Sequence, residues 1–367
     1  MIDRLGGRAL DDLYAVAEIG PWRTASPRPA PAWQGGAVSW NARALDVLAA
    51  GEPTPLIDFP VQAPGIRLLL KDESAQPTGS LRHRHARALF RQAVLDGLVT
   101  EGTTVVEATG GNAAVAQAWF ARRLGLPYIV VMPGERSQAR ARAVEALGGE
   151  CRFVTPPLAI YDAARGIPGH FLDQFGRAAE HDLGEELFAQ VRPDWVVTGA
   201  GTGATSATLG RWVRDHDVPC RVAVADPDNS AYFPGWTLDV SDYATGMPSR
   251  IEGIGRPRVE PGFRPDLVDL VIPVPDAASV AAARHLRAVT GLAVGGSSGT
   301  ALWAALELVE RMRSRGESGT VVSLVGDAAD RHLATYHDEA WAAAKGLDAG
   351  PYTDELRRRV ALRPGGE

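Results

Sequence analysis

Lysine is nearly missing from this chain. Of its 367 residues 38 are Lys or Arg, and the lysines among them are Lys71 and Lys345 alone. Arginine therefore carries almost all of the positive charge. A guanidinium stays protonated in proteins, so a reaction that needs an amine side chain has only these two lysines to draw on.

Cysteine is equally scarce. Cys151 and Cys220 each stand in an apolar, strand-like stretch. Two buried thiols in a cytosolic protein are the simplest interpretation, ahead of a disulfide or a metal site. The sequence also lacks a cluster of His, Cys, Asp and Glu with metal-ligand spacing, so we expect no metal. It has no Gly-x-Ser-x-Gly elbow or Cys-His arrangement for nucleophilic catalysis.

Long hydrophobic runs are absent as well. No stretch approaches the roughly 20 apolar residues that a membrane-spanning helix needs. The first residues include acidic side chains and no apolar run of the kind found in secretory signals. The net charge of -6 argues against nucleic acid as the main partner. These absences predict a cytoplasmic protein that binds neither nucleic acid nor a membrane.

What the sequence does contain is an alternation of strand-like and helical segments. Strands are expected at residues 66–71, 103–107, 128–132 and 151–154, and in a second series at 195–198, 221–225 and 320–325. Helices are expected at 80–98, 113–124, 139–147, 205–215, 277–290 and 300–314, with Ser80 as the N-cap of the first. Such runs imply parallel sheets covered by helices. The predicted fold class is α/β, with two parallel-sheet domains and a ligand cleft between them.

The two series also set the expected domain boundaries. Residues 61–164 are expected to form a smaller α/β domain, and residues 51–60 together with 165–345 a larger one that carries a phosphate loop. Residues 1–50 are interpreted as an N-terminal extension packed on the body, since Trp22, Trp33 and Trp40 need a place to be buried. Residues 346–367 are expected to form a C-terminal tail that is frayed at its polar end.

Three glycine-rich loops each precede an expected helix, and two of them, at residues 109–112 and 199–205, also follow an expected strand. In residues 199–205 the glycines let backbone N–H groups converge on an anion, and Thr202 and Thr205 add hydroxyl donors. A phosphate monoester suits this loop. A nucleotide and a plain tight turn remain alternatives, because a Gly-x-Gly-x-x-Gly pattern alone is a weak signal.

The other two loops add different donors. Residues 109–112, Thr-Gly-Gly-Asn, offer N–H groups and an asparagine amide to a carboxylate. Residues 295–300 are rich in hydroxyls and include Ser297. Three such loops at sheet ends together predict a small ligand with separate phosphate and carboxylate groups.

A resemblance to a known family runs from about Thr54-Pro-Leu56 to about Tyr336, and its main motif is Lys71-Asp-Glu-Ser-Ala-Gln-Pro-Thr-Gly-Ser80-Leu-Arg-His-Arg84. This stretch is similar to the motif of the cysteine synthase family, the fold-type-II pyridoxal-phosphate enzymes, which runs Lys-x-Glu, Asn-Pro-x-x-Ser and then Lys-x-Arg. Further matches extend to Tyr336; those at residues 249–258 and 296–300 look closest to the bacterial cysteine desulfhydrase branch. The resemblance implies a tryptophan synthase beta-like fold, pyridoxal phosphate as cofactor and a homodimer.

Two positions depart from the family pattern. The family's lysine, which holds pyridoxal phosphate as an imine, aligns with Arg82, and a guanidinium cannot act as that amine or as a proton shuttle. The family's serine at the pyridine nitrogen aligns with Ala328, which has no hydroxyl. Because both losses touch the same cofactor, we expect pyridoxal phosphate to be held non-covalently, if it is held at all.

The candidate catalytic residues are Arg82, His83 and Asp327. Arg82 could bind a phosphate or carboxylate bidentately, or could be a relic that faces solvent. His83 could serve as an acid or base, whereas a surface role is expected for His85. Asp327 could be a new acid or a helix partner. A replacement amine from Lys71 is disfavoured, because the place of this residue in the family motif is structural.

The candidate binding residues follow the loops. For the substrate they are Ser80, Thr109, Gly110, Gly111 and Asn112. For the cofactor or a phosphate group they are Gly201, Thr202, Gly203, Ala204, Thr205, Ser297 and Ala328. The expected ligand is an amino acid or a phosphorylated small molecule.

Three functional hypotheses follow. The preferred one is a cysteine synthase- or cysteine desulfhydrase-like lyase or transferase that acts on an amino acid, or an amino-acid adduct, without covalent pyridoxal phosphate. The second is a non-catalytic binding or regulatory relative that uses domain closure as a sensor. The third is an ordinary pyridoxal-phosphate lyase or β-replacement enzyme that carries a lysine-to-arginine substitution.

Overall fold

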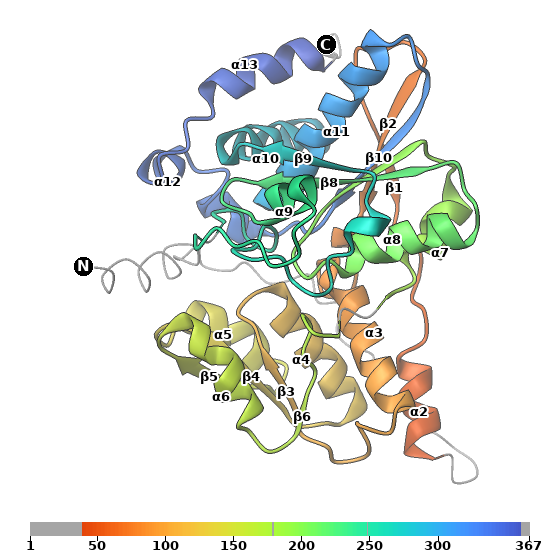
Figure 1. Ribbon diagram of the computed structural model, residues 1–367. Coiled ribbons are helices and arrows are strands. Elements are labelled where there is room, and N and C mark those ends of the chain that lie inside the picture. The colour runs from red at the N-terminus through yellow and green to blue at the C-terminus, as the bar shows by residue number, and fades with distance from the viewer. Residues whose placement is uncertain (1–38, 178–179, 248, 361–367) are drawn as a thin grey trace. The chain divides into compact units, whose positions relative to one another are not determined.

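The computed structural model describes residues 39–177, 180–247 and 249–360. Within these ranges the chain divides into two compact units, both drawn in Figure 1. The first unit comprises the described residues up to 52 and those from 82 to 179, and the second comprises those from 53 to 81 and from 180 onward. Each unit has its own sheet with parallel strands, which confirms the predicted α/β fold class. Trp22 and Trp33 lie outside the described residues.

The first unit is built on a four-stranded parallel sheet in the order β5-β4-β3-β6. Its strands are β3 (Val105–Ala108), β4 (Tyr128–Pro133), β5 (Glu150–Val154) and β6 (His170–Phe171). Its helices are α2 (Trp40–Val47), α3 (Arg82–Leu95), α4 (Asn112–Leu124), α5 (Gln138–Glu145) and α6 (Ile160–Arg165), with a 3-10 turn at Pro157–Ala159.

Alternate side chains of this sheet enter two separate clusters. Val105 and Val130 pack in a cluster with residues of α3 and α4, whereas Val106 and Val131 pack with Ile160 of α6. Successive strand residues point to opposite faces, so both faces are covered. This is why the strands read as continuous apolar runs in the sequence.

The second unit has a six-stranded sheet in the order β1-β2-β10-β7-β8-β9, antiparallel only between β1 and β2. Its strands are β1 (Leu56–Phe59), β2 (Ile66–Asp72), β7 (Trp195–Gly199), β8 (Arg221–Pro227), β9 (Leu270–Val274) and β10 (Gly319–Val325). Its helices are α7 (Leu183–Gln190), α8 (Ala204–Asp215), α9 (Tyr232–Leu238), α10 (Asp276–Thr290), α11 (Gly296–Ser314), α12 (Glu339–Ala344) and α13 (Gly350–Arg359). Short 3-10 turns cover Glu73–Ala75, Pro265–Leu267 and Asp330–Ala334.

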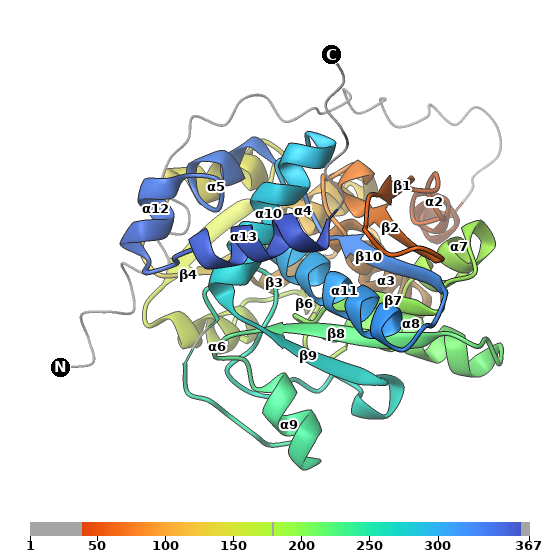
Figure 2. The same ribbon diagram turned by 90° about the horizontal axis from the view of Figure 1, so that it is seen from above.

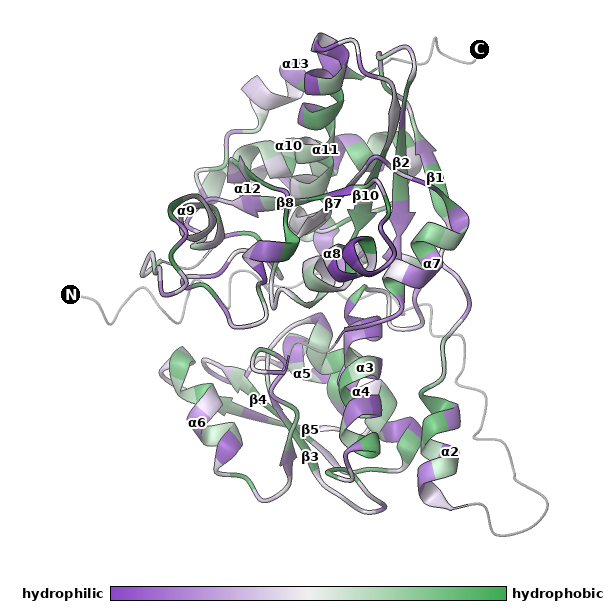
Figure 3. Ribbon diagram, turned by 45° about the vertical axis from the view of Figure 1, so that its right-hand side comes forward, coloured by the Kyte–Doolittle hydropathy of each residue, from purple (hydrophilic) through white to green (hydrophobic). Residues whose placement is uncertain are grey.

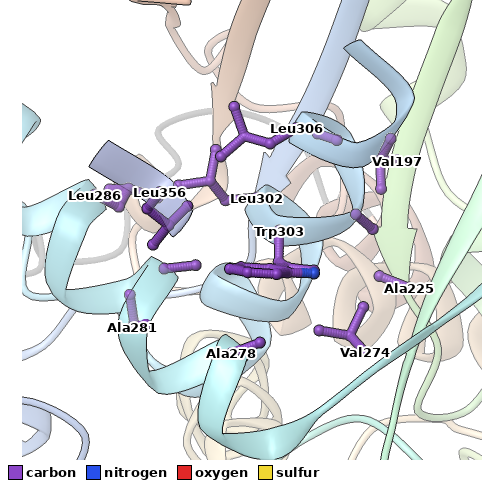
Figure 4. Packing of buried hydrophobic residues seen from close by; sticks show 14 of the residues in the cluster. Val197, Ala225, Val274, Ala278, Ala281, Leu286, Leu302, Trp303, Leu306 and Leu356 are labelled. Atoms are coloured by element: carbon purple, nitrogen blue, oxygen red, sulfur yellow. The ribbon is translucent and has the colours of Figure 1, made fainter. Parts of the chain in front are cut away.

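Helices α10, α11 and α13 pack against one another in this unit, as Figure 2 shows from above. In the close view of Figure 4, Leu302, Trp303 and Leu306 of α11 lie among the small side chains Ala278 and Ala281 of α10. Small residues on one helix let the larger ones of its neighbour interdigitate at high density. Figure 3 colours the chain by hydropathy, with hydrophobic colour along the central strands and mixed colour along the helices.

The unit boundaries differ from those expected from the sequence. Residues 61–81 belong to the larger unit, because β2 pairs with β10 and β1 in the six-stranded sheet. Residues 165–177 belong to the first unit, because β6 pairs with β3. Residues 40–47 form α2 and pack on the first unit, where the Trp40 indole N–H donates to the Leu124 carbonyl at 3.3 Å. The C-terminal residues up to 360 are packed, since α13 buries Leu356 in the core.

Two smaller expectations have clear outcomes. Both cysteines are free and buried, as predicted. Burial raises the pKa of the Cys151 thiol to about 11 and that of the Cys220 thiol to about 12.

The N-cap predicted at Ser80 is wrong, because α3 begins at Arg82 and Ser80 pairs instead with Asp327 in an isolated β-bridge. No helix among the described residues is long and apolar enough to cross a bilayer.

The packing of α13 leads to a stability prediction. Leu356→Ala removes a fully buried side chain, so we expect it to lower the free energy of unfolding by about 2–5 kcal/mol. The matched control is Leu158→Ala, since Leu158 is 79% exposed and its truncation should stay within about 0.5 kcal/mol. Denaturant unfolding measures both variants. Equal, small effects would show that residues 350–360 are not part of the folded core.

Candidate active site

The phosphate loop predicted at residues 199–205 joins the carboxyl end of β7 to the start of α8. Ligands of parallel α/β sheets bind at this edge, where loops follow the carboxyl ends of the strands. The first N–H groups of α8 have no intrahelical acceptor, and the positive end of the helix dipole lies there. The local fold therefore supplies the anion-binding geometry that the sequence predicts.

Packing fixes the backbone of this loop. Gly203 has a left-handed φ of 87°, and a Cβ atom there would collide with the backbone of Gly262 and Phe263. The Tyr232 hydroxyl donates to the Gly201 carbonyl at 2.6 Å. The glycine at position 203 is thus required by both conformation and close approach.

The threonines of the loop are placed differently from each other. The Thr202 hydroxyl accepts a hydrogen bond from the Ala204 N–H at 3.3 Å, so it caps the loop itself. The Thr205 hydroxyl lies 3.3 Å from Nε2 of His181. Of the two threonines, Thr205 is the one whose hydroxyl is paired with another side chain, so the hydrogen bond with His181 orients this hydroxyl.

A second group of predicted residues meets beyond the end of β10. Ser80 forms a β-bridge with Asp327, and Val294 forms one with Ala328. The Leu81 N–H donates to the Gly326 carbonyl at 2.8 Å. These backbone contacts bring together Ser80, Asp327 and Ala328, which the sequence places about 250 residues apart.

The third glycine-rich loop joins this group. The Gly326 N–H donates to the Ser298 hydroxyl at 3.0 Å, and a Cβ atom at Gly326 would stand 3.4 Å from the Ser297 hydroxyl. Ser297 therefore lies beside the segment that contains Ala328, as a shared cofactor site requires. Sequence reasoning named Ser297 but missed Ser298, whose hydroxyl holds the two loops together.

Ser80 contributes a buried hydroxyl to the same group. Its side chain is 1% exposed, and among the described residues its Oγ has no hydrogen-bond partner. Leaving a buried hydroxyl unpaired costs about 1–3 kcal/mol. A ligand oxygen that pairs with Oγ would recover this energy, which fits the predicted binding role of Ser80.

Asp327 stands in a network of charges. Its Oδ2 accepts from Nε2 of His332 and from Nη2 of Arg331, both at 3.0 Å, and Nη1 of Arg331 donates to Glu252 at 2.8 Å. Gly295 lies against it, since a Cβ atom there would stand 2.5 Å from Oδ1. Of the two roles considered for Asp327, the network favours the partner of the following 3-10 turn. A catalytic role stays a prediction.

In the first unit, the predicted carboxylate loop at residues 109–112 follows β3 and starts α4. The Thr109 N–H donates to the Val131 carbonyl at 3.0 Å, and Gly111 is the N-cap of α4. A Cβ atom at Gly110 would stand 3.2 Å from the Pro133 ring. Asn112 is the first residue of α4. Backbone N–H groups at a helix start suit a carboxylate.

Glu107 is a residue of this region that sequence reasoning missed. It is the penultimate residue of β3 and is 1% exposed, and desolvation by burial raises its pKa to about 7. The available signal was an acidic residue inside an otherwise apolar, β-branched strand, because such a residue rarely enters a core without a role.

The histidines of α3 are both buried. The His83 ring lies against Trp119 and Phe120, with ring centroids 4.9 and 4.6 Å apart. These surroundings favour packing over proton transfer, and the acid-base role of His83 stays a prediction. The surface role expected for His85 is wrong, because His85 is 4% exposed. Helix α3 buries one more face than the sequence pattern indicates, since α2 and α4 both pack on it.

The contacts of Lys71 agree with the structural role that was expected of this residue. Its side chain is fully buried, and Nζ donates to the Thr54 carbonyl at 2.7 Å, to Glu186 at 2.5 Å and to Gln190 at 2.7 Å. An ammonium has three protons to donate, and all of them have acceptors here.

The residues present fit one part of pyridoxal phosphate and conflict with another. The loop at 199–205 joins β7 to the start of α8, and its backbone N–H groups suit a phosphate group. Arg82, which the resemblance aligns with the family's lysine, is the first residue of α3 and directly follows Leu81, whose N–H is bonded to Gly326. An arginine does not form an imine, so non-covalent binding of the cofactor stays a prediction.

Comparisons with known proteins agree with this geometry. A family model described as "pyridoxal-phosphate dependent enzyme" matches residues 47–327. The L-cysteine desulfhydrase of Mycobacterium tuberculosis is 44% identical over 340 residues, which cover 85% of this chain and 92% of that protein. The cysteine synthase of Aquifex aeolicus is 30% identical, covering 74% and 83% of the two chains. The crystal structure of O-ureido-L-serine synthase matches with a TM-score of 0.68 and 25% identity, covering 82% of this chain and 98% of that one.

The cradle leads to a prediction about Gly203. Gly203→Ala meets both left-handed strain and a backbone collision, so we expect a loss of about 2–5 kcal/mol in unfolding free energy and of phosphate binding. Gly253→Ala is the matched control, because Gly253 has the same φ of 87° with nothing within 4 Å. It should lose only the strain of about 1–2 kcal/mol. Calorimetry with inorganic phosphate measures binding, and wild-type affinity in the Gly203→Ala protein would contradict the assignment.

Proposed function

This chain belongs to the family of pyridoxal-phosphate dependent enzymes, and we propose that it is a cysteine synthase- and cysteine desulfhydrase-like enzyme without a lysine-bound cofactor. Its ligand in this proposal is an amino acid such as L-cysteine, or an amino acid already joined to pyridoxal phosphate. Cytoplasmic location and a homodimer stay predictions that go with this proposal.

The observation that carries the proposal is the state of the two lysines. Lys71 is fully buried with its ammonium bonded to Glu186, Gln190 and the Thr54 carbonyl. Lys345 is the C-cap residue of α12. In our proposal Arg82 takes the family's lysine position, and neither described lysine belongs to the three glycine-rich loops.

The remaining residues support binding and orientation. The N–H groups at the start of α8 and the Thr205 hydroxyl suit a phosphate group, and the buried Ser80 hydroxyl suits a ligand oxygen. Residues 109–112 suit the carboxylate of an amino acid. Bound pyridoxal phosphate supplies an electron sink for the amino acid's Cα. Arg82 contributes a fixed positive charge, which attracts anions but cannot accept a proton at neutral pH.

The second candidate, a non-catalytic binding protein, is favoured by one observation. The segment after β10 has Ala328 where the family has a serine, so the hydroxyl that tunes the ring is missing along with the lysine. Binding and turnover must therefore be measured separately.

The proposal leads to a trapping prediction. When the protein is incubated with pyridoxal phosphate and reduced with borohydride, we expect no stoichiometric adduct on Lys71 or Lys345. The Lys71 ammonium is buried and bonded internally, and Lys345 is the C-cap of α12, outside the three glycine-rich loops that would bind the cofactor. Arg82→Lys is the positive control and should take up one adduct at residue 82. Peptide mass spectrometry locates the adduct, and a stoichiometric adduct on Lys71 of the wild type would contradict the proposal.

Turnover distinguishes the candidates. Calorimetry should show that the wild type binds pyridoxal phosphate together with L-cysteine, and mass spectrometry should detect a product. Binding without any product supports the non-catalytic candidate instead. An Arg82→Lys protein that turns yellow and releases sulfide from L-cysteine would point to an ordinary enzyme with a substituted lysine.

A further inference from the structure

Glu107 ties two loops of the first unit together. Its Oε1 accepts the Ala108 N–H at 2.8 Å, directly before the carboxylate loop at residues 109–112. Its Oε2 accepts the Gln174 N–H at 3.1 Å, in the turn that follows β6. The residue before Gln174 is Asp173, which has a positive φ of 52°. This turn therefore holds a strained backbone against the carboxylate.

A side-chain relay continues from the same carboxylate. Nε2 of Gln117, on α4, donates to Oε2 of Glu107 at 3.1 Å, and the Tyr128 hydroxyl donates to Oε1 of Gln117 at 2.8 Å. Glu107, Gln117 and Tyr128 are all buried. Every neighbour of Glu107 is thus a donor, and within the described residues Glu107 forms no ion pair. The donors favour the carboxylate, whereas burial favours the neutral acid.

We propose that Glu107 is a positioning residue, and that the relay of Glu107, Gln117 and Tyr128 switches between two protonation states. One state holds the turn at residues 173–176 beside the carboxylate loop, and the other releases it. This proposal rests on the proposed function in one respect only, namely that the loop at residues 109–112 binds the carboxylate of an amino acid.

The two states differ by one proton and one amide flip. In the carboxylate state Glu107 accepts from Gln174, Ala108 and the Gln117 amide, and Gln117 accepts from Tyr128. When a proton from solvent adds to Oε2, the new hydroxyl needs an acceptor. Gln117 supplies one by turning its oxygen toward Glu107 and its nitrogen toward the Tyr128 oxygen. Oε2 then donates, so the Gln174 N–H loses its charged acceptor and the turn is released.

The surrounding groups set the pH at which this happens. Asp173, from the turn after β6, is the charged group that acts on Glu107, and it raises the pKa. From β4 the facing titratable group is Tyr128, whose pKa is itself raised by burial, with smaller contributions from Glu107 and from Cys151 on β5. From α4 the facing side chain is the neutral Gln117. Desolvation is the largest cause, and the pKa of Glu107 rises to about 7, so the switch lies near neutral pH.

The sign of the stability effect follows. Because the folded pKa of about 7 exceeds the ordinary value of 4.5, the protein takes up a proton on folding between these pH values. The contribution of Glu107 to the unfolding free energy is therefore largest below pH 4.5, falls as pH rises through this window and is flat above about 7. The turn at residues 173–176 is therefore held best above about pH 7, where Glu107 contributes least to the free energy of unfolding.

The test uses Glu107→Gln in the full chain. The glutamine amide donates toward Gln117 as the acid does, so this variant should copy the released state at every pH. In the wild type, amide exchange of the peptide containing Gln174, corrected for its intrinsic pH dependence, should slow as pH rises through about 7. In the variant it should be fast throughout. L-Serine, whose carboxylate and amine keep their charges in this range, should bind roughly tenfold more weakly to the variant above pH 7.

A second variant tests the relay itself. Tyr128→Phe removes the hydroxyl to which Gln117 bonds in both orientations, so the infrared midpoint of the Glu107 carboxyl band should shift by about one pH unit from its wild-type value. A merely structural role of Glu107 would not move this midpoint. Glu101→Gln, at an exposed position of the same unit, should change neither readout.

Each of these measurements supports or overturns the proposed switch. Unchanged pH-dependent exchange in Glu107→Gln, or an unshifted band in Tyr128→Phe, overturns the inference. If L-serine binds at no pH, the proposed function fails, while exchange and infrared results still decide whether the switch exists.

Discussion

The hydrogen bonds of the buried Lys71 ammonium tie β2 of the larger unit to the segment before β1 and to α7. Its three acceptors are the Thr54 carbonyl, Glu186 and Gln190. Burying an ammonium costs several kcal/mol unless its protons are all paired, and here they are. An amine used in this way is not available to a ligand, because Glu186 and Gln190 would lose their charged donor.

The binding geometry depends on backbone pairing more than on any one side chain. The strands β2, β10 and β7 are neighbours and run parallel, so their carboxyl ends open at one edge of the sheet. The segments that follow β2 and β10 meet through the Ser80–Asp327 bridge, and the Ser298 hydroxyl joins residues 295–300 to the segment after β10. The bridge is a backbone contact that does not use the side chain at position 82. In our proposal the arrangement of these segments therefore does not depend on a lysine at that position.

The sequence predicts the regular parts of this arrangement well. The strand and helix series, the loops at 109–112 and 199–205 and the structural role of Lys71 follow from local patterns and one motif. The sheet that β2 joins does not, because strand pairing across about 250 residues leaves no local signal. The burial of His85 was missed for a related reason. Its helix is polar by composition, and only the tertiary packing of α2 and α4 on it shows how little of it faces water.

Proton transfer is the step that our proposal leaves to the ligand, and the contacts of the candidate residues give the reason. A guanidinium such as that of Arg82 stays charged at working pH. His83 is packed among aromatic rings, and Asp327 is bonded to Arg331 and His332. Burial raises the pKa of Glu107 to about 7, but its carboxylate already accepts from two loops. In the proposed function these groups bind, orient and hold charge, and the ligand brings the amine. An amino acid, free or already joined to the cofactor, is therefore the ligand that we propose.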